Sequence, residues 1–383
     1  MKIGILCHDS CGGSTRIAVC EACELARKGH EVHLFSKTTP FIHVTATAGL
    51  FQHTLSRTCL KSNRSSLEVV WPEDEMESMV RLISDVVSAK GLQVLHVHYA
   101  LPLAYIALEV KTRLPRPGPA LVATLHGSEV SVFGRDPLVG LKLTRALKTF
   151  DALTTVSASH ARLAGQVLNL ETDPMVIPNF LDLDFYPAKA PVLSGPKPRI
   201  IHISNFRWLK DPQGIARIFA AVRTNLEAEL WLVGHGEAMA AVERYLKHHH
   251  LQGEVRFFGL HRDVAAVLGQ ADLLLMNSRL ESFCLAALEA MACGLPVVAS
   301  KVGGLPEVVG HQRTGFLFPR NDDETAAGYV LRLLSEPGLY RSMSLAAREQ
   351  ASRFDQKTVV PLYERLYDRV SAERLIEPQR RGD

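Results

Sequence analysis

The sequence predicts an α/β protein built from two doubly wound domains, each around a parallel sheet. Short apolar segments alternate with segments of helical period, and parallel strands need such crossover helices. The first unit runs from the apolar segment 3–6 through a glycine turn and a helical stretch to a strand expected at 31–35. Four prolines and one glycine in 187–198 interrupt this rhythm, which starts again at Arg199. The interruption indicates two domains rather than one.

The expected domain boundaries follow from this proline-rich interruption of the alternating strands and helices. We expect an N-terminal Rossmann-like domain at 1–186, a stiff linker at 187–198 and a C-terminal Rossmann-like domain at 199–355. The amphipathic last segment, 356–383, is expected to form a helix that packs back on the N-terminal domain. Ligands of such sheets bind beyond the carboxyl ends of the strands, so the functional groups are expected in a cleft between the domains.

Each expected element rests on its own local signal. Strands are short runs of apolar and β-branched residues, and helices have a period near 3.6 with glycine or proline at their ends. Residues 43–70 show no clear period, so no structure is predicted for them. In the first domain we expect strands at 3–6, 31–35, 94–98, 120–124 and 152–156, and helices at 79–89, from 102 and at 138–150. In the second we expect strands at 199–203, 228–233, 255–258, 273–276 and 296–299, and helices at 214–226, 237–249, 264–268, 285–292 and 325–334.

Composition excludes several classes of protein. The chain has 383 residues, of which 47% are hydrophobic and 22% charged, values typical of a globular protein. The 43 Lys and Arg against 40 Asp and Glu leave +3, too little for a nucleic-acid-binding protein. An apolar run of about 18 residues, which a membrane span needs, is absent from the sequence. Seven scattered cysteines and a short apolar start favour a soluble protein of the cytoplasm.

Cationic side chains follow the first strand of the second domain. Arg207 and Lys210 stand three residues apart after the strand, within HISNFRWLKD. An arginine can bind a diphosphate through two hydrogen bonds, and a lysine adds a point charge. Gly234 follows the next strand and opens a helix, another place where backbone N–H groups can approach an anion. The alternatives are a solvated loop and a plain turn.

The most informative segment is ESFCLAALE. If its helix begins near Phe283 or Cys284, the free N–H groups at that end can bind phosphate. Glu281 would lie at the helix mouth and Glu289 about 9 Å further along, at ~1.5 Å per residue. Two carboxylates at that separation suit the hydroxyls of one extended ligand. Glu289 lies among apolar residues, which a surface helix would not explain.

Two motifs of the first domain also stand at the ends of strands, where they could bind a ligand. Gly12 and Gly13 stand between a strand and a helix, although their spacing is not that of a dinucleotide fingerprint, and a plain tight turn fits equally well. His126 lies in TLHGSEV at the end of a strand, where a catalytic or substrate-orienting group belongs. A capping histidine is the alternative.

A metal site is not expected. Cys20 and Cys23 have the spacing of a zinc knuckle, but both fall within a predicted helix. His96 and His98 project to one face of a strand and could form a metal pair, yet no third ligand is apparent in the sequence. Core packing explains the cysteines adequately.

These motifs, in this order, resemble the retaining glycosyltransferases of family 4, which have the GT-B architecture of two Rossmann-like domains. The resemblance rests on MKIGI with GGS, LHVHYALP, TLHGSEV, VIPNF, HISNFRWLK, VRFFG and ESFCLAALEAMACGLPVVASKVGGLPEVV, followed by TGFLF. It implies a UDP-sugar donor, no cofactor and no metal, and it suggests a homodimer. HVHYA, TLHGSEV and HISNFR are most similar to the branch that serves bacillithiol biosynthesis, which implies transfer of N-acetylglucosamine from UDP-GlcNAc to L-malate.

The resemblance implies donor-side roles residue by residue. Arg207 and Lys210 would hold the diphosphate and stabilise the leaving UDP, and Glu281 would contact the sugar. The ribose would be bound by Glu289. The other implied donor-binding residues are Gly12, Gly13, Gly234, Phe283, Cys284 and Leu285, where Cys284 stands in place of the family's glycine.

The resemblance also implies acceptor-side and catalytic roles. His126 would lie against the donor sugar and join Arg207, Lys210 and Glu281 as catalytic residues. The implied acceptor-binding residues are Ser14, Tyr99, Thr124 and Arg145, of which Arg145 suits a carboxylate. Residues 41–75 depart from the pattern of this branch, so the donor is better defined than the acceptor.

Other functions remain open at this point. The acceptor could be a lipid, a glycan or another small alcohol, and 51–60 is weakly of the basic, apolar type that a lipid acceptor requires. A sugar-nucleotide epimerase of the same architecture would consume no acceptor. A protein that binds a nucleotide sugar without catalysis is the third alternative, suggested by Cys284.

Overall fold

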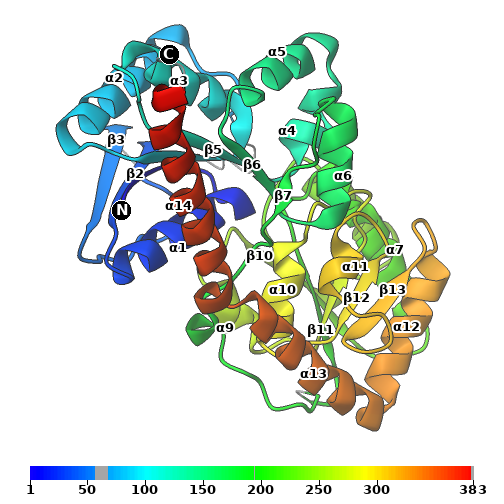
Figure 1. Ribbon diagram of the computed structural model, residues 1–383. Helices are drawn as coiled ribbons and strands as arrows, with labels where there is room; N and C mark the ends of the chain where they lie inside the picture. Colours follow the sequence, from blue (N-terminus) through cyan, green and yellow to red (C-terminus); the bar gives the residue numbers. More distant parts are fainter. Residues whose placement is uncertain (57–67, 194, 381–383) are drawn as a thin grey trace. The chain divides into compact units, whose positions relative to one another are not determined.

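The computed structural model describes residues 1–56, 68–193 and 195–380 and divides the chain into two compact units. Unit 1 comprises Met1–Asn179 together with the segment from Gln356 onward, and unit 2 comprises Phe180–Asp355. Each unit has a parallel sheet covered by helices, which confirms the predicted fold class (Figure 1). None of the helices in the described ranges is both long and apolar enough to cross a membrane.

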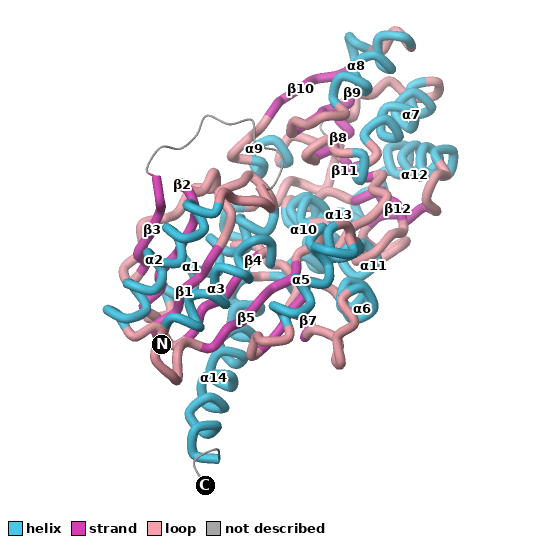
Figure 2. The backbone as a smooth tube through the Cα atoms, turned by 90° about the horizontal axis from the view of Figure 1, so that it is seen from above, coloured by secondary structure: helices cyan, strands magenta, loops and turns pink. Residues whose placement is uncertain are grey.

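The sheet of unit 1 has seven parallel strands in the order β3-β2-β1-β4-β5-β6-β7 (Figure 2). The chain moves outward from β1 to β3 and then returns to pair β4 with β1, so the sheet order reverses between β1 and β4. Its strands are β1 Lys2–Leu6, β2 Glu31–Thr38, β3 Leu50–Ser56, β4 Val94–His98, β5 Ala120–Leu125, β6 Ala152–Thr155 and β7 Met175–Val176.

Strand β3 lies within the segment for which the sequence predicts no structure. It is an edge strand in which no residue is fully buried, so it lacks the apolar alternation of a half-buried strand. The rest of that segment includes 57–67, which lies outside the described residues, and so does part of the weakly apolar stretch 51–60.

The helices of unit 1 begin and end at recognisable signals. The carboxylate of Asp136 accepts the N–H groups of Leu138 and Val139 at the start of α5, with Pro137 in the first turn. Gly91 ends α2 in the left-handed conformation. The helices are α1 Gly13–Arg27, α2 Glu73–Lys90, α3 Ala100–Arg113, α4 Ser128–Ser131, α5 Pro137–Leu147, α6 Ala158–Val167 and α14 Gln356–Arg380, with one 3-10 turn, η1 Phe133–Arg135.

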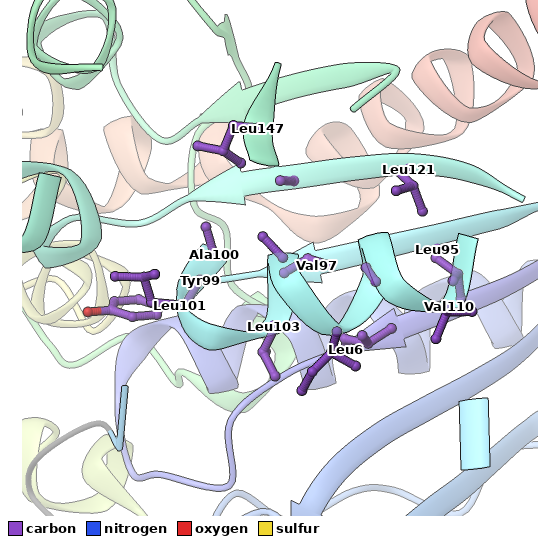
Figure 3. Packing of buried hydrophobic residues seen from close by; sticks show 14 of the residues in the cluster. Leu6, Leu95, Val97, Tyr99, Ala100, Leu101, Leu103, Val110, Leu121 and Leu147 are labelled. Atoms are coloured by element: carbon purple, nitrogen blue, oxygen red, sulfur yellow. The ribbon is translucent and has the colours of Figure 1, made fainter. Parts of the chain in front are cut away.

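One face of this sheet packs on an apolar core beneath α2, α3 and α5. Leu95 and Val97 of β4 and Leu121 of β5 point to that face and meet Leu103 and Val110 of α3 (Figure 3). Because alternate side chains of a strand point to opposite faces, the residues between them must point the other way.

The opposite face carries a buried polar layer beneath α1 and α14, which pack against each other (Figure 1). His96 and His98 of β4 point to this face, where Glu21 of α1 and Tyr367 of α14 meet them. The Tyr367 hydroxyl donates to Glu21, and its oxygen lies 2.6 Å from Nδ1 of His96. The last helix therefore supplies a hydrogen-bond donor to the interior of unit 1.

Unit 2 has a six-stranded parallel sheet in the order β10-β9-β8-β11-β12-β13. Its strands are β8 Arg199–Ile203, β9 Glu229–Val233, β10 Val255–Gly259, β11 Leu273–Met276, β12 Val297–Ser300 and β13 Gly315–Phe318. Its helices are α7 Pro212–Arg223, α8 Met239–His248, α9 Val264–Leu268, α10 Leu285–Ala292, α11 Leu305–Val308, α12 Asp323–Ser335 and α13 Pro337–Ala351, with 3-10 turns η2 Leu183–Phe185, η3 Trp208–Lys210, η4 Gln252–Glu254 and η5 Ser352–Phe354.

The segment between Phe180 and Arg199 belongs to unit 2, although the sequence divides it between the first domain and a linker. Polar contacts hold it there. The ammonium of Lys189 lies 2.5 Å from the carboxylate of Asp272, and the guanidinium of Arg348 donates to the carbonyl of Tyr186 at 2.6 Å.

From the polar layer of unit 1 we predict that loss of the Tyr367 hydroxyl lowers the free energy of unfolding. In Tyr367→Phe the fully buried carboxylate of Glu21 loses a donor, and an unsatisfied buried acceptor costs about 1–3 kcal/mol. We expect the free energy of unfolding, measured by urea denaturation, to fall by about that amount. Tyr105→Phe, at a half-buried position against the apolar core, is the matched control and should leave stability almost unchanged. Equal losses in the two variants would contradict the assignment.

Candidate active site

In unit 2 the loops that follow β8 and β11 meet where the order of the strands reverses. The N–H of Arg279 donates to the carbonyl of Leu209 at 2.8 Å, which joins the two loops. Asp211 accepts from the side chains of Asn277 and Arg279 at 3.1 and 3.2 Å. Such a reversal point, beyond the carboxyl ends of the strands, is where doubly wound sheets bind ligands.

Lys210 and Glu281 face each other across this reversal point. The ammonium of Lys210 lies 2.5 Å from Oε1 of Glu281, and the hydroxyl of Ser278 donates to the same oxygen at 2.9 Å. Burial on its own lowers the pKa of Lys210, but the charge and hydrogen bond of Glu281, together with the effect of Cys284, outweigh burial and raise it. The lysine is therefore a cation beside the carboxylate.

A pair of glycines fixes the backbone of Glu281. The N–H of Gly304 donates to the carbonyl of Glu281 at 3.0 Å. A Cβ on Gly303, which has a φ of +52°, would lie 1.8 Å from that carbonyl oxygen, so only glycine fits there. The role of these two glycines was not predicted, although the GG of VGGLPEVV could have indicated a close backbone approach.

Helix α10 begins directly after Cys284, where the sequence predicts its start. Cys284 has a φ of +80°, in the left-handed region that favours glycine, the residue that the resemblance implies at this position. Burial first, and then the charge of Glu281, raises the pKa of the Cys284 thiol, so it is no nucleophile at neutral pH. The first N–H groups of this helix have no acceptor one turn earlier within the helix itself.

Glu289 is buried on α10 with a polar partner. The hydroxyl of Tyr186 donates to its Oε1 at 3.0 Å. Tyr186 was not predicted from the sequence, because it is distant along the chain and stands in a loop without a motif.

Arg207 stands in a tightly folded loop. Phe206 and Asp211 on either side have positive φ values of 43° and 40°, so the loop turns sharply before and after the two cations. A Cβ on Gly234 would lie 1.8 Å from the carbonyl oxygen of Ser204, so this glycine allows the loop to pack closely. Arg207 is half-buried at the start of η3.

In unit 1 the loops after β1 and β4 meet in the same way. Gly12 precedes the first turn of α1, and its N–H donates to the Ser10 hydroxyl at 3.3 Å. Gly13 and Ser14 are the first residues of that helix, so the predicted glycine turn does open it. Nε2 of His8 lies 2.8 Å from the carbonyl oxygen of Leu101 and ties the two loops together.

The loops after β4 and β5 bring together Tyr99 and the TLHGSEV segment. The hydroxyls of Tyr99 and Ser128 are 2.7 Å apart. Both carboxylate oxygens of Glu129 accept backbone N–H groups, from His126 at 2.5 Å and from Gly127 at 2.9 Å. Burial raises the pKa of Glu129 to about 7 against the effect of these two donors. The backbone of His126 is thereby held in place.

Thr124 and Arg145 lie in different surroundings. The hydroxyl of Thr124 is fully buried in the polar layer, 2.7 Å from Nε2 of His96 and 2.6 Å from the hydroxyl of Thr154. Its geometry favours a part in that layer over binding of an acceptor. Arg145 is exposed in the last turn of α5.

Three donor groups come close enough to share a metal ion in the described part of the chain. Oxygen and nitrogen atoms of Glu21, His96 and His98 lie within 4.8 Å of one another, all buried. Glu21 is the third residue that could not be identified from the sequence, because it stands on a helix distant from the two histidines.

Comparisons with known proteins agree with this geometry. The family described as Glycosyltransferase Family 4 matches residues 11–185, and Glycosyl transferases group 1 matches residues 188–350. The N-acetyl-alpha-D-glucosaminyl L-malate synthase of Bacillus anthracis is 32% identical over 375 residues, 96% of each chain. A D-inositol 3-phosphate glycosyltransferase of Saccharomonospora viridis is 44% identical over 93 residues, 24% of this chain and 22% of its own.

Solved structures show the same fold. A sucrose-phosphate synthase of Thermosynechococcus elongatus superposes with a TM-score of 0.81 at 20% identity, over 97% of this chain and 100% of its own. The Anabaena protein HepE in complex with UDP-glucose superposes with a TM-score of 0.77 at 18% identity, over 96% and 99%.

The fold and the family comparisons together define a glycosyltransferase of the GT-B class. The chain belongs to the family 4 glycosyltransferases, with a group 1 glycosyltransferase domain as its second half.

The left-handed conformation of Cys284 predicts how this position responds to substitution. Cys284→Gly should change the free energy of unfolding in urea by less than about 1 kcal/mol, because relief of backbone strain offsets the loss of a small buried side chain. Cys284→Val should lower it by about 1–3 kcal/mol, because a β-branched residue is strained there. Cys293→Val, at a buried position with a φ of −80°, controls for packing alone. An equal loss at both positions would show that backbone strain is not the cause.

Proposed function

We propose that this glycosyltransferase moves N-acetylglucosamine from UDP-GlcNAc to a small hydroxy acid such as L-malate, with retention of the anomeric configuration. The observation that carries the proposal is the likeness to the Bacillus anthracis synthase, which extends over 96% of both chains and so includes both units. Sequence similarity confined to unit 2 would support the nucleotide-sugar donor but not the acceptor.

The donor half of the proposal rests on the charges of unit 2. Arg207 and Lys210 would bind the diphosphate, with the first N–H groups of α10 as further donors. Carboxylates repel a diphosphate, so Glu281 and Glu289 are assigned to hydroxyl groups of the sugar and the ribose. The glycine pair that fixes the Glu281 backbone supports this role, since a hydroxyl ligand requires a well-placed acceptor.

Unit 1 is assigned to the acceptor and the sugar. Gly12 and Gly13 at the start of α1 would approach the reacting centre, with Ser14 beside them. Tyr99 and Arg145 are assigned to the carboxylates of the acceptor. His126 is assigned to a hydroxyl of the transferred sugar.

The proposed reaction needs no enzymic nucleophile. The bond from the anomeric carbon to the β-phosphate oxygen breaks, and the acceptor oxygen bonds to the same face of that carbon. The acceptor hydroxyl transfers its proton to the departing phosphate oxygen. Negative charge grows on that phosphate in the transition state, so Arg207 and Lys210 bind the transition state more tightly than the ground state.

A direct assay tests the proposal. Purified protein is incubated with UDP-GlcNAc, UDP-glucose or UDP-galactose and with L-malate, glycerol or inositol phosphate, and products are identified by mass spectrometry. We expect UDP release together with an α-linked N-acetylglucosaminyl malate. A conjugate with another acceptor would replace the malate assignment, and a rearranged sugar nucleotide without acceptor would identify an epimerase. Binding of UDP-sugar with no product from any pair would reject transferase activity.

Substitution of the first cation tests the diphosphate site. Removing one group that stabilises developing charge typically costs about 10²–10³ in kcat, and Arg207→Ala is expected to lose that much. Arg207→Lys keeps the charge but not the paired hydrogen bonds, so its loss should be smaller. Arg256→Ala, at an exposed ion pair with Glu229 in the same unit, is the control. Steady-state kinetics close to wild type in Arg207→Ala would remove Arg207 from the site.

A further inference from the structure

The polar layer of unit 1 continues as far as His126. We propose that Glu21 is a positioning residue, which acts through His98 to fix the orientation and tautomer of the His126 ring. This inference rests on the proposed function, in which His126 contacts the transferred sugar. Glu21 itself lies on α1 and touches His98, not His126.

The contacts form a continuous chain from α1 to the loop after β5. Oε2 of Glu21 lies 3.1 Å from Nε2 of His98. The other nitrogen of that ring, Nδ1, lies 3.1 Å from Nε2 of His126. His98 and Glu21 are fully buried, and His126 is 9% exposed. His98 therefore bridges a buried carboxylate and a side chain at the carboxyl edge of the sheet.

The charges along this chain favour one arrangement of protons when the His98 ring is neutral. Burial on its own raises the pKa of Glu21, but His96 and His98, which face it, hold it well below its usual range, so Glu21 is ionised. Burial, reinforced by His98, lowers the pKa of His126 well below its usual value, so this ring is neutral. The negative charge of Glu21, 3.1 Å away, favours a proton on Nε2 of His98, although this contact is not a hydrogen bond of good geometry.

The position of the proton on His98 then determines the position of the proton on His126. A neutral His98 ring with its proton on Nε2 offers the lone pair of Nδ1, which accepts the Nε2–H of His126. A neutral His126 ring that donates through Nε2 carries its own lone pair on Nδ1. The same logic, in which a buried carboxylate holds a histidine in one tautomer, operates in catalytic triads. Here it would present His126 as a hydrogen-bond acceptor.

A shared metal ion is the alternative use of these side chains, and their other contacts disfavour it. Nδ1 of His96 lies 2.6 Å from the Tyr367 hydroxyl, and its Nε2 lies 2.7 Å from the Thr124 hydroxyl. Oε1 of Glu21 accepts from Tyr367. Only Oε2 of Glu21 and Nε2 of His98 lack a hydrogen bond of good geometry within this group. Two ligand atoms are too few for a closed protein site.

Glu21→Gln tests the proposal because it keeps the shape and removes the charge. Loss of such a supporting partner commonly costs about 10- to 100-fold in activity, and we expect kcat to fall by that factor. The KM for UDP-GlcNAc should stay within about twofold, since the diphosphate and the ribose are assigned to residues of unit 2. Glu21→Asp, which restores the charge on a shorter side chain, should recover part of kcat. Glu24→Gln, one turn further along the same helix at an ion pair with Arg27, is the matched control.

The pH profile separates positioning from mere loss of stability. The groups that act on His126 are His96, His98, His160 and Glu21, and Glu129 accepts from its backbone. Of these, Glu21 stabilises the protonated His126 ring. Removing its charge lowers the pKa of His126 further, so the acid limb of the kcat profile should move to lower pH. A purely structural role would lower the melting temperature and leave that limb unmoved.

A readout that needs no turnover separates this inference from the proposed function. Long-range ¹H–¹⁵N NMR of histidine-labelled protein should show His126 protonated at Nε2 in the wild type and a mixture of tautomers in Glu21→Gln. If that holds while no sugar–acceptor pair reacts, the transferase proposal fails and the positioning chain stands. Wild-type kcat with unchanged tautomers in Glu21→Gln would overturn the inference. Stoichiometric zinc in the purified protein, lost in that variant, would overturn it in favour of a metal site.

Discussion

The proposed donor site of unit 2 depends on the buried carboxylate of Glu281. A buried charge is stable only with partners, and Lys210 and Ser278 from the two sides of the reversal point supply them. Gly304 fixes its backbone from a third loop. These contacts determine where the chain turns into α10 and where the N-terminal N–H groups of that helix begin. A ligand that binds there meets groups already in position, which is the condition for electrostatic catalysis.

Unit 1 uses a second buried glutamate, Glu21, in a comparable way. In both units a carboxylate beside the parallel sheet is surrounded by donors from elements far apart in sequence. The partner in unit 2 is a cation, whereas in unit 1 the partners are a tyrosine hydroxyl and two imidazoles. A cation suits a site that binds an anion, and imidazole rings suit one that must hold or direct a proton.

Much of this arrangement could be predicted from local sequence. The βα rhythm predicted both sheets, and the start of α10 after Cys284 followed from one motif. Groups positioned by tertiary contacts could not be predicted: Tyr186 reaches Glu289 across 103 residues, and Gly303 is required only because the Glu281 carbonyl lies against it. Strand β3 was missed for another reason, since an edge strand with little buried surface lacks the alternation that identifies strands.

The polar layer shows why the last helix belongs with the first unit. An apolar helix could cover this face of the sheet, but it would leave the Glu21 carboxylate and the His96 ring without the donor and acceptor that Tyr367 provides. Unpartnered groups at such depth cost more than the hydrogen bonds add, so covering the layer with α14 is a condition of keeping it. The residue at 367 therefore affects both the stability of unit 1 and the alignment of Glu21 with His98. On the proposed role of Glu21, a substitution of Tyr367 would alter His126 through Glu21 and His98, without a direct contact to a ligand.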